Sequence, residues 1–281
     1  MINSDLLKRG LLTRDSYSHK GDYGHLLLLC GNESMPGAAV LATGAALKSG
    51  CGLVTLHSTP RALLAAVTVC PSAILSENAG SCITMVPTDL SKYSAIGIGP
   101  GIGREPATQN AVHRLLEQAN EARIPMLIDA DALNILSLHK DWLNEIPSGS
   151  VMTPHDGELR RLTDWNGVDA RELAAKELCE RTGCVVVMKG FGSQVLTPTG
   201  VKYTNTTGNA GLAKGGSGDV LSGLLSGLMA RGYDAATASA MAVWIHGYAA
   251  DCLTSKCTAE AYNSNDLINS IFKGFSRLYS I

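Results

Sequence analysis

The sequence is poor in aromatic residues and has no strong excess of either charge. Phe, Trp and Tyr make up 5% of the 281 residues, and 23 Lys and Arg residues stand against 25 Asp and Glu residues, a net charge of −2. Proteins that bind nucleic acids usually combine a basic surface with aromatic side chains that stack on bases, so we expect no nucleic-acid partner. The 30 glycines instead predict tight turns and close backbone approaches, which suit small anionic ligands.

A long hydrophobic run is also missing. The longest stretch without Asp, Glu, Lys or Arg, residues 235–250, contains His246 and is shorter than the roughly 18 residues that a membrane-spanning helix needs. The first residues carry scattered charges and lack the apolar segment of a signal peptide. We therefore expect no membrane partner and a cytoplasmic protein.

The cysteines lack the spacing of a disulfide framework or a zinc site. They stand at positions 30, 51, 70, 82, 179, 184, 252 and 257, with no C-x-x-C pair and no His at zinc-finger spacing. Most of them lie in apolar segments. We expect them to be small buried hydrophobic side chains in a reducing compartment.

Short apolar runs alternate with longer amphipathic segments, which is typical of an α/β protein with a parallel sheet and helices on both faces. The sequence predicts strands at 25–30, 52–57, 94–98, 125–128, 150–153 and 184–188, an antiparallel hairpin from 193–196 and 201–205, and helices over 111–119, about 218–231 and about 235–251. Gly232 stands where a glycine would end the first of the last two helices. Without a linker or repeat, one domain over residues 1–281 is the economical interpretation.

The strongest chemical signal is a glycine-rich segment, 208–223, that leads into a predicted helix. Gly215, Gly216, Ser217 and Gly218 precede or open this helix, where free backbone N–H groups and the helix dipole favour a phosphate. Asp219 follows in the first turn, and the dipole predicts a low pKa for it. It is either a structural helix cap or a base that takes a proton from a substrate hydroxyl. The segment is not a Walker A loop.

Two further segments, 32–39 and 97–103, follow predicted strands and are rich in glycine and other small residues. Ligands of open α/β sheets bind beyond the carboxyl ends of the strands, so both segments are candidate binding loops. Each one alone could equally be a structural turn, and the second lacks the context of a Rossmann dinucleotide fingerprint.

Polar side chains end two other predicted strands. Asp129, Asp131 and Asn134 follow the first strand, and His155 and Glu158 follow the second. They could orient a polar ligand, position water or hold Mg²⁺ through water. For His155 a structural hydrogen bond at the strand end is the alternative, and no second His or Cys supports zinc.

A lysine followed by glycines ends a further predicted strand. The segment consists of Lys189, Gly190, Phe191, Gly192 and Ser193. A lysine and a hydroxyl around glycines can contact the phosphates or ribose of a nucleotide, and the entry to a hairpin is the structural alternative.

These segments resemble a known family when they are taken in chain order. They are H-K-G-D-Y-G-H at 19–25, N-E-S-M-P-G-A-A at 32–39, G-P-G-I-G at 99–103, D-A-D-A-L-N at 129–134, T-P-H-D-G-E at 153–158, K-G-F-G-S at 189–193 and N-A-G-L-A-K-G-G-S-G-D-V-L-S-G at 209–223. Together they closely resemble the ADP- or ATP-dependent NAD(P)H-hydrate dehydratases. The resemblance implies a ribokinase-like three-layer α/β/α sandwich with a mostly parallel central sheet. It also implies a repair reaction that converts the S epimer of hydrated NADH or NADPH (NADHX or NADPHX) back to NAD(P)H and releases AMP or ADP and phosphate.

The resemblance also implies roles for individual residues. Asp219 is expected to be the catalytic base. The NAD(P)HX site is expected to include Ala38, Ala39, Gly101, His155 and Asp219, and the site for ADP or ATP is expected to include Lys189, Gly190, Phe191, Gly192, Ser193, Gly215, Gly216, Ser217 and Gly218. Mg²⁺ is expected to bridge the phosphates, with unknown protein ligands, and a homotetramer is the expected assembly.

The sequence departs from the family pattern at two positions. Asp156 and Ala210 both stand where the family often has proline. The separate epimerase domain of many relatives has no room in 281 residues, so we expect activity on the S epimer only. Two alternatives remain: a kinase of a small alcohol such as a thiazole or pyrimidine vitamin precursor, and a catalytically silent nucleotide sensor, which could lack Asp219.

Overall fold

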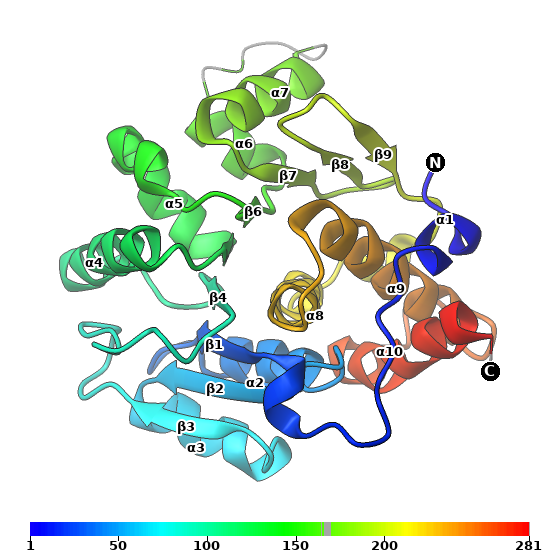
Figure 1. The fold of residues 1–281 in the computed structure, drawn as a ribbon, viewed down its shortest axis with the longest axis horizontal. Coiled ribbons are helices and arrows are strands. Elements are labelled where there is room, and N and C mark those ends of the chain that lie inside the picture. The colour runs from blue at the N-terminus through cyan, green and yellow to red at the C-terminus, as the bar shows by residue number, and fades with distance from the viewer. Residues whose placement is uncertain (164, 166–169, 281) are drawn as a thin grey trace.

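A nine-stranded sheet forms the centre of the protein. The structure is a computed structural model and describes residues 1–163, 165 and 170–280. The strands lie in the order β3 (Ile74–Glu77), β2 (Leu53–Ser58), β1 (His25–Leu29), β4 (Ala95–Ile98), β5 (Met126–Ile128), β6 (Val151–Met152), β7 (Val185–Met188), β8 (Gln194–Leu196) and β9 (Lys202–Thr204). All pairs from β3 to β7 are parallel, whereas β8 and β9 are antiparallel to their neighbours. The strands form an arc around one central helix (Figure 1).

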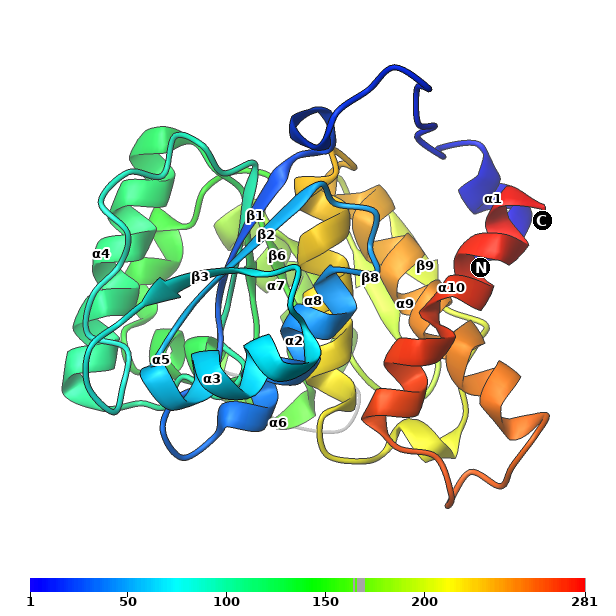
Figure 2. The same cartoon turned by 90° about the horizontal axis from the view of Figure 1, so that it is seen from below.

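Helices cover both faces of this sheet (Figure 2). One face is covered by α2 (Pro36–Ala46), α3 (Pro60–Val69), α8 (Ser217–Ala230), α9 (Ala235–Thr254) and α10 (Ser264–Tyr279), and the other by α4 (Pro106–Ala122), α5 (Ala130–Leu138), α6 (Asp156–Leu162) and α7 (Arg171–Thr182). In β1, Leu26 and Leu28 belong to the first core and Leu27 and Leu29 to the second. Because successive side chains of a strand point to opposite faces, an unbroken leucine run fits a strand that is buried on both sides.

The central helix, α8, packs closely against α2. A Cβ atom on Gly223 would lie 2.0 Å from the carbonyl oxygen of Ala42, and one on Gly227 would lie 2.1 Å from Ser49 Oγ. Neither distance leaves room for a side chain, so glycine is required at both positions. At the periphery, α1 (Ser4–Lys8) lies beside α10, and Lys8 Nζ donates to Ser280 Oγ at 3.0 Å, which brings the two ends of the chain together.

The three-layer α/β/α architecture with a mostly parallel sheet is confirmed, as is the antiparallel hairpin. Each of the six other predicted strands matches an observed one to within three residues at either end, and α9 continues to Thr254, beyond the predicted end. Gly232 follows the end of α8 with φ +107, as predicted. The prediction missed β3, an edge strand in which Ile74 and Leu75 are about two-fifths exposed, because such a strand needs no continuous apolar run.

All eight cysteines have free thiols, and Cys30, Cys70, Cys179 and Cys184 are buried. Burial raises the pKa of the Cys184 thiol to about 12, so this side chain stays protonated and unreactive. The expectation of buried hydrophobic thiols therefore holds for these four, and the other four are partly exposed. Within the described part of the chain, no helix has both the length and the apolar character that crossing a membrane requires.

Candidate active site

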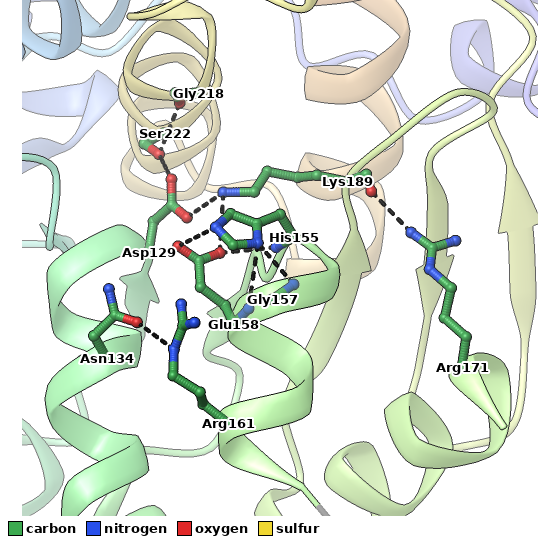
Figure 3. A network of polar contacts seen from close by, with 10 residues as sticks. All are labelled: Asp129, Asn134, His155, Gly157, Glu158, Arg161, Arg171, Lys189, Gly218 and Ser222. Atoms are coloured by element: carbon green, nitrogen blue, oxygen red, sulfur yellow. Dashed lines mark hydrogen bonds and ion pairs between the residues drawn. The ribbon is translucent and has the colours of Figure 1, made fainter. Parts of the chain in front are cut away.

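Five of the segments that the sequence singled out meet at one edge of the sheet. They follow β1, β4, β5, β6 and β7, which are parallel, so their carboxyl ends lie at the same edge. The beginning of α8 lies beside them, because Ser222 of α8 contacts Asp129 at the end of β5 (Figure 3). This is the edge at which open α/β proteins bind their ligands.

Asp129 links three elements at this edge. It is 2% exposed, and its Oδ1 atom lies 2.6 Å from Lys189 Nζ, at the end of β7. Its Oδ2 atom accepts a hydrogen bond from Ser222 Oγ of α8. The next residue, Ala130, has φ +48, a backbone conformation that costs energy for a residue with a side chain. The fold therefore holds Asp129 in place despite local strain.

Lys189 is a largely buried cation, 19% exposed, that is shared by two carboxylates. Besides Asp129, its Nζ atom lies 3.6 Å from Oε2 of Glu158, which is itself 4% exposed (Figure 3). Burial disfavours the charged form of Lys189, but Asp129 and Glu158 outweigh this effect and raise the lysine pKa. Burial raises the pKa of Glu158, Lys189 opposes that shift, and repulsion from Asp129 adds to it. The sequence suggested that Lys189 contacts a nucleotide, whereas the structure directs its ammonium group into this carboxylate cluster.

Asp219 lies in the first turn of α8, but the prediction of a low pKa is wrong. Burial, assisted by repulsion from Asp129 and Asp131, raises the pKa of Asp219 to about 6, and attraction by Lys189 only partly opposes this. The helix dipole is a modest effect at a helix end, and here burial and like charges exceed it. A carboxylate with a pKa near 6 suits general base catalysis close to neutral pH.

The beginning of α8 is open to a ligand. Gly216 is the N-cap residue and supplies no side-chain cap, and no acceptor among the described residues pairs with the backbone N–H of Gly218 or Asp219. A Cβ atom on Gly215 or Gly218 would meet no atom within 4 Å. Free N–H groups in open space at a helix N-terminus can bind an anion.

His155 is the N-cap residue of α6. Its Nδ1 atom accepts hydrogen bonds from the N–H groups of Gly157 at 2.9 Å and Glu158 at 3.2 Å, and Glu158 Oε2 accepts one from the His155 N–H. His155 therefore forms the structural hydrogen bonds that the sequence analysis gave as the alternative to ligand binding. The ring is nevertheless 54% exposed, so it can still contact a ligand.

Ala38 and Gly101, two of the expected substrate residues, are in contact. A Cβ atom on Gly101 would lie 2.7 Å from Ala38 Cβ, so glycine allows these two segments to meet. Ala38 is partly exposed, whereas Ala39 is completely buried, and its methyl group faces Gly31 in the core. Of the two alanines, only Ala38 can present its side chain to a ligand.

The remainder of segment 189–193 forms the turn between β7 and β8. Phe191 is fully exposed, and Ser193 Oγ donates to the carbonyl of Gly190 at 3.0 Å. Apart from the Lys189 side chain, this turn therefore lies at the surface.

Sequence reasoning missed two residues that support α8. Ser222 fixes Asp129, and buried His246 of α9 places its Nε2 atom 3.0 Å from the carbonyl of Ser217. Burial, partly offset by this hydrogen bond, lowers the His246 pKa to about 4, so the ring is neutral and Nε2–H can donate. Ser222 lies inside the segment 209–223 that was singled out, but spacing alone could not show that its hydroxyl meets Asp129. His246 lies in an apolar helix at a position without distinctive spacing, so no pattern identified it.

The chain has a ribokinase-like fold. A ribokinase-like superfamily protein from Enterococcus faecalis V583 shares this fold, with a TM-score of 0.77 at 24% identity over 97% of this chain and 95% of that one. The sequence profile of the NAD(P)H-hydrate dehydratase family matches residues 26–273. The chain belongs to the NAD(P)H-hydrate dehydratase family.

Individual relatives agree with this assignment. The ADP-dependent (S)-NAD(P)H-hydrate dehydratase of Bacillus subtilis is 35% identical over 271 residues, which cover 93% of this chain and 94% of the relative. The crystal structure of the ADP/ATP-dependent NAD(P)H-hydrate dehydratase from Bacillus subtilis, co-crystallised with ATP/Mg²⁺, matches with a TM-score of 0.85 at 30% identity and covers 98% of this chain and 97% of that one. The bifunctional NAD(P)H-hydrate repair enzyme Nnr of Moorella thermoacetica is 34% identical over 269 residues, and this chain spans 50% of its length.

Proposed function

We propose that this protein catalyses the nucleotide-dependent dehydration of the S epimer of NADHX or NADPHX to NAD(P)H, with ADP or ATP as co-substrate. The observation that supports this most directly is Asp219, a carboxylate with a pKa of about 6 beside the open N-terminus of α8. The near full-length similarity to a dehydratase of this specificity from Bacillus subtilis supports the substrate assignment.

The reaction follows from the poor leaving ability of hydroxide. Asp219 accepts the proton of the substrate hydroxyl while the hydroxyl oxygen attacks the terminal phosphorus of the nucleotide, and AMP leaves from ADP or ADP leaves from ATP. The lone pair of the ring nitrogen then expels phosphate as the carbon–oxygen bond breaks. Loss of a proton from the neighbouring carbon restores the reduced nicotinamide ring.

The two ligands would occupy neighbouring parts of the site. Ala38, Gly101 and the exposed ring of His155 would contact NAD(P)HX. The turn 189–193 and the residues at the beginning of α8 would contact the nucleotide, with the free N–H groups of Gly218 and Asp219 facing its phosphates.

Mg²⁺ would enter this site together with the nucleotide. No group of three or more His, Cys, Asp or Glu side chains in the described part of the chain could hold a metal ion by itself. Both oxygens of Asp129 already have partners, and Glu158 faces Lys189 and His155. Mg²⁺ usually keeps several waters and binds through substrate phosphates, and this donor set fits that mode. When bound, it would neutralise phosphate charge.

The proposal has a direct test with purified protein, S-NADPHX and Mg²⁺. Recovery of the absorbance of NADPH should require ADP or ATP, and AMP or ADP should appear with phosphate in equal amounts. Folded protein that binds nucleotide and restores no absorbance would contradict the proposal. Phosphorylation of a thiazole or pyrimidine alcohol would then identify the alternative, a vitamin kinase that stops at the phosphorylated product.

The family resemblance supports two further proposals. We propose that the protein acts in the cytoplasm and that it forms a homotetramer. Light scattering coupled to size-exclusion chromatography should give four times the chain mass, and the mass of one chain would contradict the tetramer. Fluorescent labelling of the full-length protein in cells would test the location.

A further inference from the structure

Arg171 connects the two segments that are proposed to bind the two ligands. It is the first residue of α7, and its Nε atom lies 2.7 Å from Asp156 Oδ1, at the beginning of α6. Its Nη2 atom donates to the carbonyl oxygen of Lys189 at 2.8 Å (Figure 3). One guanidinium group thus spans from the substrate segment 153–158 to the nucleotide segment 189–193. We call this arrangement of Asp156, Arg171 and the Lys189 carbonyl the Arg171 bridge.

The Arg171 bridge supplies the last hydrogen bond to the polar groups of Lys189. The backbone N–H of Lys189 donates to Pro154 O at 3.1 Å, and its ammonium group pairs with Asp129 and Glu158. Arg171 holds the one remaining polar group of this residue, the carbonyl. All polar groups of Lys189 therefore have partners, and two of these partners lie in segment 153–158.

The position of the turn that follows Lys189 depends partly on how firmly Lys189 is held. Gly190 and Gly192 have φ values of +146 and +64, and Phe191 between them is fully exposed. Glycines lose much conformational freedom on folding, so a turn with two glycines and an exposed side chain has little intrinsic rigidity. It is held at its two ends, at Lys189 where it leaves β7 and at Ser193, whose carbonyl accepts a hydrogen bond from the N–H of Asn205 at 2.8 Å.

We infer that Asp156 and Arg171 are positioning residues, and that the Arg171 bridge makes nucleotide and NAD(P)HX bind with positive coupling. The assignment of the two segments rests on the proposed function. A ligand that orders one segment also orders the other through the bridge, so the second ligand binds to a segment that is already in place. Neither residue touches a reacting atom, so we expect the chemical step to survive without them.

The position of Asp156 allows a mild substitution. Asp156 is the first residue of α6, and no described residue accepts a hydrogen bond from its N–H. Proline is well tolerated at this helix position, and the ψ of 171° at His155 suits a residue before proline. Asp156→Pro therefore removes the carboxylate and leaves the His155 cap intact.

The coupling can be measured with the reaction products, without turnover. Titration calorimetry gives the Kd of AMP with and without saturating NADPH. We expect NADPH to tighten AMP binding about three- to tenfold in the unmodified protein, and this ratio to fall at least twofold in Asp156→Pro, in Arg171→Met and in the double variant. Pro154 and Glu158 still link Lys189 to segment 153–158 in these variants, so part of the coupling is retained. Glu172→Gln is the matched control. Glu172 follows Arg171 on α7 and forms an exposed ion pair with Lys202 of β9 at 2.8 Å, so its substitution removes an ion pair of the same helix and leaves the bridge intact.

A second measurement needs no ligand. Amide hydrogen exchange in residues 189–193 of the free protein should become faster in Asp156→Pro and Arg171→Met, and should stay unchanged in Glu172→Gln. If Arg171→Met does not fold, Asp156→Pro alone tests the bridge, since it leaves the core untouched.

The possible outcomes separate this inference from the proposed function. An unchanged coupling ratio and unchanged exchange in Asp156→Pro would overturn the inference even if the protein repairs NADPHX. A protein that binds neither AMP nor NADPH would contradict the proposed function and with it the coupling, and faster exchange in the variants would then support the positioning role alone. Equal Kd values with and without NADPH in the unmodified protein would also overturn the coupling.

Discussion

Lys189 and Lys214 lie in two glycine-rich segments near the beginning of α8, and their surroundings differ sharply. The ammonium group of Lys214 donates to the carbonyls of Ala259, Glu260 and Tyr262 at 2.7–2.8 Å and lies 4.9 Å from the centre of the Tyr262 ring. All three of its donors are used by neutral groups. Lys214 therefore fixes a surface loop and is not available to a phosphate.

Lys189 instead lies among negative charges that outnumber it. Asp129 and Glu158 share its ammonium group, and Asp219 is a third carboxylate close enough for its pKa to respond to both Lys189 and Asp129. A lysine with neutral partners has a structural role, whereas one lysine among several carboxylates leaves one of them with a perturbed pKa. Such perturbed groups are typical of functional sites.

The largest effect should come from removing the perturbed carboxylate. Asp219→Asn should lower turnover by about 10²–10⁴-fold, because the proposed general base is lost, while AMP still binds. It should also stabilise the protein at pH 7–8. The folded-state pKa of about 6 lies above the unfolded value, so the stability contributed by protonated Asp219 is lost as pH rises through 6.

At pH 7–8 Asp219→Asn should raise the free energy of unfolding by roughly 1–2 kcal/mol. This is less than the full pKa shift would give, because the side chain is partly exposed and solvent screens its interactions. Steady-state kinetics and thermal unfolding at pH 5 and pH 8 measure both effects. Turnover close to that of the unmodified protein would exclude Asp219 as the base.

Equivalent changes at the two lysines test the comparison itself. Lys189→Met leaves Asp129 and Glu158 buried without a cation and should cost about 3–5 kcal/mol of stability. It should also raise the pKa of Asp219 further. Lys214→Met leaves only neutral carbonyls without a donor and should cost about 1–3 kcal/mol, with no change in the pH profile. The comparison fails if both variants shift the pH profile equally.

The dependence of kcat/KM on pH should show an effect smaller than those of Asp219→Asn and Lys189→Met. Because Asp219 must be ionised to accept a proton, kcat/KM should fall about tenfold per unit below pH 6. Asp129→Asn removes the repulsion that helps to raise this pKa, so the acidic limb should move to lower pH. A limb that moves to higher pH in this variant would contradict the assigned cause.

Two serines of α8 allow the contribution of the Ser222–Asp129 hydrogen bond to kcat to be measured separately from its contribution to stability. We expect this to be the smallest of the effects. Ser222 Oγ donates to Asp129, whereas Ser226 Oγ, one turn later, donates to the carbonyl of Ser222 at 2.6 Å. Ser222→Ala and Ser226→Ala should each cost about 1 kcal/mol in unfolding experiments. Only Ser222→Ala should also lower kcat, by a few fold, because only that hydroxyl holds Asp129. Equal kcat values for the two variants would show that Ser222 is purely structural.

The sequence predicted most of the fold, because unbroken apolar runs such as that of β1 identify strands buried on both faces. The same reasoning missed β3, whose residues are partly exposed at an edge. For the site, spacing identified the segments that meet at the carboxyl edge. The charge state of Asp219 and the partners of Lys189 depend on distances between residues far apart in the chain, as in the pairing of Lys189 with Asp129.

The contact of Gly223 and Gly227 with α2 also affects how the site can move. No side chain of Gly223 separates the two helices, and the backbone of Ala42 lies directly against it, so α2, with Ala38 in its first turn, and α8, with Asp219 in its first turn, pack as one unit. The placement of the proposed base, Asp219, relative to the proposed substrate surface at Ala38 is then set when the protein folds. Little conformational entropy then remains to be lost when a ligand binds between these two helices, which leaves more of the interaction energy available for affinity.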